Sequence, residues 1–337
     1  MKKIIQEVKP YHVTIRLTNE EKSSLYESVR SIVYPFPSLD YEDFVSISLK
    51  VVLKALPWRI YVELRKLRTN NRPAGALIIN NLPTDKIIPP TPRNAKRSDI
   101  KKTTFISEVI LTGVSALLGE PVGYEDEKER SLLHDIIPVI KTDKPLSNEG
   151  SNADFGLHIE NAIFDRRERF VILFGQRQDR KKQANTPIVD VRNVLNHLTE
   201  DLISQLYLKE YVIRKPYILD HSHIDQYSEP VAILTGPRDN PQVRLTLYEG
   251  GTRATTDMGK KALEEFRQAA NNNVIEYKIK RGQMVIVNNY QAMHGRTTFQ
   301  AYGDGLDRYL LRSYVLESLF SVREMQRSST RVLNRGS

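Results

Sequence analysis

Two side chains that commonly bind metal ions, His158 and Glu160, stand two positions apart in the segment LHIENA at residues 157–162. In an extended chain, side chains at i and i+2 point to the same face, so a strand would place these two side by side. Two histidines and one carboxylate can hold iron(II) and leave three coordination positions open for oxygen chemistry. His294, at the end of a strongly apolar segment, is the candidate third ligand. Such a pair also arises by chance on a solvated surface, so residues further along the chain decide between the two interpretations.

Two arginines, Arg308 and Arg312, follow His294 in the segment DRYLLRSYV. Their spacing puts them on one face of the chain, whether the segment is a helix or a strand. Burying two guanidinium groups near a metal is costly unless anions neutralise them, and the planar fork of arginine suits carboxylates. The arrangement predicts two carboxylates beside one metal, namely a keto-acid co-substrate and a substrate acid. The alternative is a surface strand with two solvated arginines.

A second cluster, DHSHID, competes for the metal with Asp220, His221, His223 and Asp225. Alternate residues of this segment share a face in an extended chain and can bind zinc, which would favour a zinc hydrolase. The cluster lies in a polar link between two strand-like segments, where such side chains are normally solvated.

The composition limits the chemistry of the 337-residue chain. It contains no cysteine, which excludes disulfides, thiolate catalysis and cysteine-type zinc sites. The net charge is +9, but 41 acidic residues are interleaved with the basic ones, and no aromatic-and-basic stacking pattern accompanies them, so we expect no nucleic-acid partner. The first residues, MKKIIQEV, are not typical of a signal peptide, and no segment has the length and hydropathy of a membrane span. We therefore expect a cytoplasmic protein without a membrane partner.

Helical patterns dominate the first third of the chain. A capping box at Thr18–Glu21 opens an apolar-periodic segment that extends to about Val33. Further helical patterns cover residues 41–68, with a break at Pro57, and residues 101–118. The proline-rich segment between them, NNLPTDKIIPPTPRN, must be extended or looped.

Short β-rich segments follow from about residue 135, and turn residues separate them: IIPVI, RFVILFG, VAILTG and VRLTLY. A helix with Pro187 in its first turn and apolar positions from Val191 to Leu206 interrupts them, as does a helix over residues 257–270. Helices that pack on a sheet-rich core predict one α+β domain, whose β part is a sandwich or a double-stranded helix.

Several motifs together resemble the clavaminate synthase-like iron(II)/2-oxoglutarate oxygenases, a group that includes asparagine and arginine hydroxylases of peptide-antibiotic pathways. The resemblance covers most of the chain. Its most specific part is HGRTTFQAYGDGLDRYLLR, and NNLPTDKIIPPTP, LLHDIIPV, GLHIENA and FVILFGQRQD are similar to further segments of the family. The resemblance implies a distorted double-stranded β-helix (jelly-roll) core with N-terminal and inserted helices. It implies a single oxygenase domain over 1–337, in which 1–120 is mainly helical, 121–325 forms the core and 326–337 is a polar tail.

The resemblance also assigns roles to single residues. His158, Glu160 and His294 become the iron ligands, while Arg308 and Thr186 hold the 2-oxoglutarate co-substrate. Arg312 binds the carboxylate of the substrate.

Four positions depart from the family pattern: Ile159 lies between two ligands, Gly156 replaces an acidic residue, Thr246 replaces an acidic reader of the substrate side chain, and His134 replaces a glutamine near the amino end of the substrate. We assign His134 and Thr246 to substrate binding on this basis.

The implied activity is hydroxylation of an unactivated C–H bond in a free L-amino acid, with O2 and 2-oxoglutarate as co-substrates and succinate and carbon dioxide as products. Lysine or arginine is favoured as the substrate, and citrulline or asparagine comes next. A related oxygenase that desaturates or cyclises its substrate is the nearest alternative. An alternative of another class is a metal-binding jelly-roll module without catalytic activity.

Overall fold

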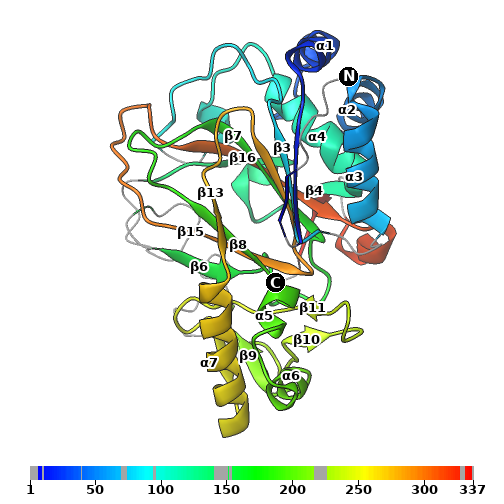
Figure 1. Ribbon diagram of the computed structural model, residues 1–337. Coiled ribbons are helices and arrows are strands. Elements are labelled where there is room, and N and C mark those ends of the chain that lie inside the picture. The colour runs from blue at the N-terminus through cyan, green and yellow to red at the C-terminus, as the bar shows by residue number, and fades with distance from the viewer. Residues whose placement is uncertain are drawn as a thin grey trace.

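Two β-sheets with helices on their outer sides form the body of the protein (Figure 1). The computed structural model describes residues 7–9, 11–38, 40–69, 74–93, 96–139, 151, 154–215, 226–326 and 331–335. The larger sheet has nine strands within these ranges, in the order β1-β2-β3-β14-β7-β16-β4-β17, and β5 also pairs with β16. These strands are β1 Glu7–Lys9, β2 His12–Arg16, β3 Ala76–Asn80, β4 Glu120–Tyr124, β5 Leu133–Ile136, β7 Phe170–Arg177, β14 Met284–Asn288, β16 Tyr309–Leu316 and β17 Val332–Leu333.

The smaller sheet has four strands within the described ranges, in the order β13-β8-β15-β6. These strands are β6 Phe155–His158, β8 Thr186–Asp190, β13 Ile275–Tyr277 and β15 Ala292–Arg296. Apolar side chains from both sheets form one buried cluster, which includes Ile188 and Ala292 from the smaller sheet and Leu173 and Leu310 from the larger. The two sheets therefore pack against each other, and the space between them is where a site can form.

Four helices cover the outer face of the larger sheet (Figure 1). They are α1 Asn19–Val29, α2 Tyr41–Ala55, α3 Trp58–Thr69 and α4 Ile106–Leu118. The predicted capping box is confirmed, since the Thr18 side chain accepts from the Glu21 N–H and the Glu21 side chain accepts from the Thr18 N–H. Pro57 separates α2 from α3, as expected for a residue that has no N–H to donate. The described ranges also contain the 3-10 helices η1 Arg97–Asp99, η2 Lys128–Arg130 and η3 Phe320–Met325.

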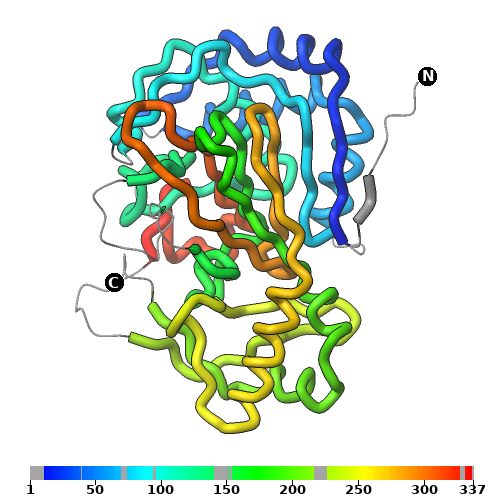
Figure 2. The backbone as a smooth tube through the Cα atoms, turned by 60° about the vertical axis from the view of Figure 1, so that its left-hand side comes forward, coloured from blue at the N-terminus to red at the C-terminus, as the bar shows by residue number. Residues whose placement is uncertain are grey.

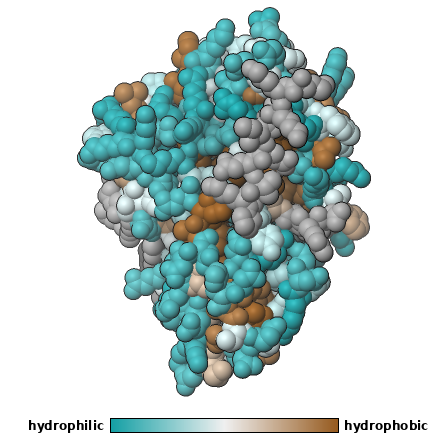
Figure 3. Space-filling model, viewed as in Figure 1, coloured by the Kyte–Doolittle hydropathy of each residue, from teal (hydrophilic) through white to brown (hydrophobic). Residues whose placement is uncertain are grey.

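A second group of helices lies at the opposite end of the molecule, in the lower half of Figure 2. It contains α5 Val191–Leu195, α6 Glu200–Leu206 and α7 Asp257–Asn272, with the short strand pairs β9 Tyr211–Ile213 with β12 Thr252–Ala254, and β10 Leu234–Thr235 with β11 Gln242–Val243. These elements pack around a second apolar core, to which Leu157, Val189 and Met293 of the smaller sheet also contribute. Hydrophilic side chains cover most of the face shown in Figure 3, and none of the helices in the described ranges could cross a membrane.

The prediction of one helix from Pro187 to Leu206 is wrong. Pro187 lies in β8, opposite Glu276 of β13, and the helical part is divided into α5 and α6. Tertiary pairing overrides the helical period here, because the β-branched Ile188 and Val189 are buried between neighbouring strands. Asp190 then ends the strand and caps α5 by accepting from the N–H of Arg192.

Several strands also differ from the prediction. β2 and β3 lie in the part of the chain that was expected to be mainly helical, and β3 pairs with β14. The strand expected at IIPVI lies earlier, at β5. VAILTG contributes only the two-residue strand β10, and VRLTLY contributes only Val243 of the two-residue strand β11. The described chain therefore has a mixed α/β architecture.

Candidate metal centre and its cavity

His158 and His294 lie opposite each other on neighbouring strands of the smaller sheet. β6 ends at His158, and the strand register pairs this residue with His294 of β15. Gly295 permits the close approach of the two strands, because a Cβ atom there would lie only 2.6 Å from the carbonyl oxygen of Phe155. Glu160 lies in the turn that follows β6, so the two residues of the pair do not share one strand. The turn nevertheless places the side chain of Glu160 beside the two histidines.

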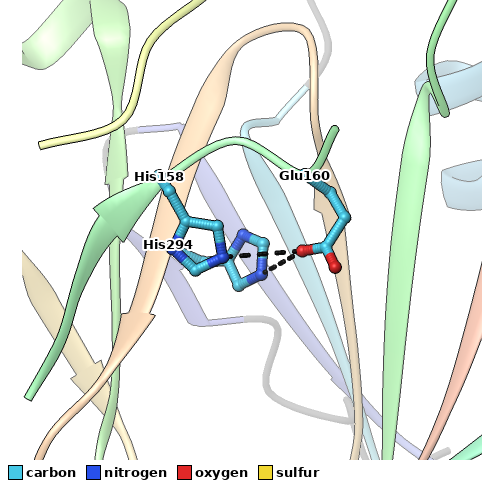
Figure 4. A group of neighbouring side chains, drawn as sticks. All are labelled: His158, Glu160 and His294. Atoms are coloured by element: carbon cyan, nitrogen blue, oxygen red, sulfur yellow. Dashed lines mark ion pairs between the residues drawn. The ribbon is translucent and has the colours of Figure 1, made fainter. Parts of the chain in front are cut away.

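The three side chains point toward a common centre (Figure 4). Oε2 of Glu160 lies 3.5 Å from Nε2 of His158 and 3.5 Å from Nε2 of His294, and the ligand atoms of all three lie within 4.8 Å of one another. Nδ1 of His158 lies 2.8 Å from the carbonyl oxygen of Gly156, so Nδ1 donates and Nε2 presents its lone pair to the centre. Two imidazoles and one carboxylate oxygen are the donor set that suits a non-heme iron(II) ion with open positions. The residues therefore fit this metal.

The other oxygen of Glu160 is held by the larger sheet. Oε1 accepts from Nη1 of Arg312 at 2.6 Å and from the hydroxyl of Tyr314. Burial by itself would raise the pKa of Glu160, but Arg312 and the two histidines hold that pKa well below its ordinary range. Glu160 is therefore an ionised ligand whose orientation is fixed, with Oε2 directed at the centre.

The backbone on either side of Glu160 is fixed as well. Asn289 accepts from the Glu160 N–H at 2.7 Å and donates to the Glu160 carbonyl oxygen at 3.1 Å. Ile159, the residue between the two ligands, is 1% exposed and packs in the apolar core of the second helix group. Its isoleucine side chain therefore serves packing on the side away from the metal, which explains its departure from the family pattern.

A narrow cavity joins the metal centre to two arginines of the larger sheet. The volume of this cavity, counted as the space that the centre of a water molecule can occupy, is about 50 Å³. Arg308 directly precedes β16, Arg312 lies within β16, and Thr186 begins β8 on the opposite sheet. The lining residues are Ile136, Phe155, His158, Glu160, Leu173, Thr186, His294, Gly295, Arg296, Arg308, Leu310 and Arg312. Six residues that the sequence placed in the site thus surround one space.

Arg308 is a buried cation that has no bonded carboxylate among the described residues. Its Nη2 donates to the Thr186 hydroxyl at 3.3 Å. Burial and the neighbouring Arg296 lower the pKa of Arg308 to about 10, and burial lowers the pKa of Arg296 to about 10 as well. This end of the cavity therefore suits an anion, because a carboxylate there would pair directly with the buried guanidinium of Arg308.

Arg312 is bonded to three groups of the protein. Besides Glu160, its Nη2 donates to Oε1 of Glu127 at 2.6 Å and to Nδ1 of His134 at 2.8 Å. A guanidinium has five N–H donors, so these three bonds leave two, one of which is on Nε, a buried atom without a partner in the described ranges. An incoming carboxylate can still bind Arg312 through its two remaining N–H groups, because the protein occupies only three of the five.

Neither His134 nor Thr246 lines the cavity. His134 is 1% exposed and accepts from Arg312 at Nδ1, so its proton lies on Nε2, which has no partner among the described residues. Thr246 forms an isolated β-bridge with His158, and its hydroxyl is buried without a described partner. Asp220, His221, His223 and Asp225 of the rival DHSHID cluster fall outside the described residues.

The surroundings of His134 predict that the protein loses stability in acid. Burial lowers the pKa of His134 from 6.5 to about 3, and Arg312 adds to this effect. Between these pH values the unfolded chain binds a proton that the folded chain does not, so the free energy of unfolding falls as the pH falls, by at most about 1.4 kcal/mol per pH unit for this one group. We expect His134→Gln to reduce this slope in urea unfolding of the metal-free protein between pH 6.5 and 4.5. An unchanged slope in the variant would show that His134 is not held neutral.

Sequence reasoning missed Glu127, Tyr314, Asn289 and Arg296. Tyr314 had a usable signal, because it lies two positions after Arg312 and therefore faces the same side of β16. Arg296 belongs to the HGR motif, and its side chain lines the cavity. Glu127 and Asn289 lie just outside the regular strands, and no spacing rule connects them to the ligands.

Comparison with known proteins agrees with this geometry. Residues 105–314 match the taurine catabolism dioxygenase TauD, TfdA family. The L-asparagine oxygenase of Streptomyces coelicolor is 29% identical over 280 residues, which cover 83% of this chain and 82% of the relative. The L-lysine 3-hydroxylase of Catenulispora acidiphila is 25% identical over 331 residues, which cover 94% of this chain and 88% of the relative.

A solved structure is similar over nearly the whole length. The non-heme iron oxygenase OrfP, in complex with iron, succinate and (3S)-hydroxy-L-Arg, superposes with a TM-score of 0.81 at 27% identity, covering 95% of this chain and 99% of that one. The resemblance inferred from the sequence motifs is thereby confirmed. The chain belongs to the taurine catabolism dioxygenase TauD, TfdA family.

Proposed function

We propose that this protein is an iron(II)/2-oxoglutarate-dependent dioxygenase that hydroxylates an unactivated C–H bond of a free L-amino acid. One observation carries the proposal: a single narrow cavity is lined at one place by His158, Glu160 and His294 and elsewhere by the buried Arg308 and Arg312. A metal with open positions beside two separate cationic groups suits one keto-acid and one amino-acid carboxylate.

We further propose that the nine- and four-stranded sheets together form a distorted double-stranded β-helix, and that residues 1–337 act as a single oxygenase domain. The pairing of β3 with β14 and the apolar cluster shared by both sheets support this proposal. In such a core, the smaller sheet contributes the metal ligands and the larger sheet contributes the arginines.

The residues that line the cavity have different tasks in this mechanism. Iron(II), when bound, supplies the activation of O2 that couples decarboxylation of 2-oxoglutarate to hydroxylation of the substrate. Arg308 and the Thr186 hydroxyl bind the distal carboxylate of 2-oxoglutarate, and Arg312 binds the substrate carboxylate. Two fixed anchors orient both acids at the metal, and the apolar Ile136, Leu173 and Leu310 on the cavity wall exclude water.

For the substrate we favour lysine or arginine, followed by citrulline or asparagine. The relatives named for L-asparagine and L-lysine, and the solved structure that holds hydroxy-L-Arg, support a free amino acid. We also propose that His134 and Thr246 support the substrate site from outside the cavity lining, because His134 accepts from Arg312 and Thr246 is paired with His158 in a β-bridge. The neutral hydroxyl of Thr246 does not by itself demand a cationic side chain.

Mass spectrometry of a panel of free amino acids tests the proposal. The protein is incubated with iron(II), ascorbate, 2-oxoglutarate and L-lysine, L-arginine, L-citrulline or L-asparagine. We expect one of them to gain one oxygen atom while succinate accumulates in equal amount. Loss of two hydrogen atoms would instead identify a desaturase or cyclase. A protein that binds iron(II) but consumes no 2-oxoglutarate with any of them would be a non-catalytic module.

A further inference from the structure

The last described residues, 331–335, form a strap along the edge of the larger sheet. We call them the C-terminal strap. Its β17 runs parallel to β4, and the Glu125 N–H donates to the carbonyl oxygen of Leu333 at 3.0 Å. Val332 and Leu333 are buried in this position. The strap therefore directs its final described residue, Arg335, toward the loop that carries Glu127.

The side chain of Arg335 is almost completely buried. Its side chain is 4% exposed, and its Nη2 donates to Oε2 of Glu127 at 2.8 Å. Its guanidinium carbon lies 3.6 Å from the centre of the Tyr124 ring, which is a close cation–π contact. An arginine side chain is ordinarily solvated, and removing its charge from water is costly unless it is paired. The burial therefore indicates a specific task at Glu127.

Glu127 connects Arg335 to the candidate active site. One of its oxygens accepts from Arg335, and the other accepts from Nη2 of Arg312 at 2.6 Å. Arg312 in turn donates to Glu160, the metal ligand, at 2.6 Å. Four buried charges of alternating sign thus lead from the C-terminal strap to the metal centre.

Arg335 has two effects on Arg312. Because Glu127 is held from both sides, it cannot rotate, and it fixes the plane of the Arg312 fork. Arg335 also offsets the negative charge of Glu127, so Glu127 cancels less of the positive charge of Arg312. Without Arg335, Glu127 would offset the charge of Arg312 more fully, and the attraction of Arg312 for an anionic group would fall.

We propose that Arg335 is a positioning residue for substrate binding: it acts through Glu127 to hold Arg312 oriented and cationic for the carboxylate of the amino acid. This proposal rests on the proposed function, in which Arg312 binds that carboxylate. The C-terminal strap is accordingly a working part of the substrate site.

The test compares Arg335→Gln with Arg331→Gln. Arg331 lies on the same strap and is equally buried, but it binds Glu42 and Glu120, which do not contact the cavity. Binding of the four amino acids to the protein loaded with iron(II) and 2-oxoglutarate is measured without oxygen by calorimetry. We expect Arg335→Gln to raise the Kd of the bound amino acid by about tenfold or more. The Kd of 2-oxoglutarate stays unchanged, and Arg331→Gln binds the amino acid like the wild type.

Arg335→Lys keeps the positive charge beside Glu127 but lacks the planar guanidinium that orients Glu127. We therefore expect a Kd for the amino acid between those of the wild type and Arg335→Gln. If Arg335→Gln does not fold, Arg335→Lys decides alone, and wild-type affinity in that variant overturns the proposal. Equal losses in Arg335→Gln and Arg331→Gln, or a parallel loss of 2-oxoglutarate binding, would show a purely structural role and also overturn it. A wild type that binds none of the amino acids overturns the proposed function and this proposal with it. Normal binding by both the wild type and Arg335→Gln overturns this proposal only.

Discussion

Replacing His294 with alanine is expected to abolish tight binding of iron(II) and to reduce the consumption of 2-oxoglutarate by more than about 100-fold, beyond the range that is usual for residues that only support a ligand. His294 supplies one of three protein ligands, and its Nε2 lies 3.5 Å from the carboxylate oxygen that completes the centre. With one imidazole removed, His158 and Glu160 alone do not fix the geometry of the ion. Metal content after gel filtration and succinate formation are the measurements.

Two control variants make this prediction specific. His197→Ala changes an exposed histidine, and His221→Ala changes the rival DHSHID cluster. Both should retain iron and activity. Should His221→Ala lose the metal while His294→Ala keeps it, the centre described here is not the metal site, and the zinc-hydrolase interpretation is favoured.

Replacing Arg308 with methionine is expected to weaken binding of 2-oxoglutarate by roughly 100-fold. Loss of one partner of a buried ion pair costs about 3 kcal/mol, and each 1.4 kcal/mol corresponds to about a tenfold change in Kd. The reason lies in the cavity, where Arg308 is buried with Thr186 as its bonded neighbour and has no bonded carboxylate among the described residues. Titration of 2-oxoglutarate into the iron(II)-loaded protein without oxygen measures this effect.

The same substitution should cost the ligand-free protein little or no stability. Burial lowers the pKa of Arg308 to about 10, which means that the folded protein disfavours its charge. Removing this charge should therefore leave the free energy of unfolding within about 1 kcal/mol of the wild type or increase it. Arg167→Met is the matched control, because burial lowers the pKa of Arg167 to about 10 as well but its side chain does not line the cavity. Equal 2-oxoglutarate affinity in both variants would contradict the role of Arg308.

The metal centre could be predicted from the sequence because a few residues of characteristic type and spacing carry its chemistry. A His-x-Glu pair, a distant histidine and two arginines four positions apart all indicate the same chemistry, a metal ion beside bound carboxylates. The structure brings His158, Glu160 and His294 to one centre and places Arg308 and Arg312 on its cavity. The pairing of β6 with β15, which connects residues far apart in the chain, follows from no local pattern.

Other parts of the fold and of the site could not be predicted from the sequence, and the reasons are physical. Pro187 and the apolar residues after it fit a helix by their period, yet pairing with β13 and β15 makes the first of them a strand. The strand β3 is short, and its first four residues are all apolar, so alternation does not reveal it. Glu127 meets both Arg312 and Arg335 only through the tertiary fold, and a segment that reads as polar in sequence contains the buried side chain of Arg335, paired with Glu127.

Isotope labelling of the oxygen atoms tests the central claim most directly. The protein, iron(II), 2-oxoglutarate and the amino acid identified in the panel are incubated under heavy-isotope O2 in ordinary water. We predict one labelled atom in the hydroxylated amino acid and one in succinate, with neither product formed by His294→Ala. Succinate without label, or a modified amino acid formed equally well without 2-oxoglutarate, would contradict the assignment of this cavity to iron(II) and a keto-acid.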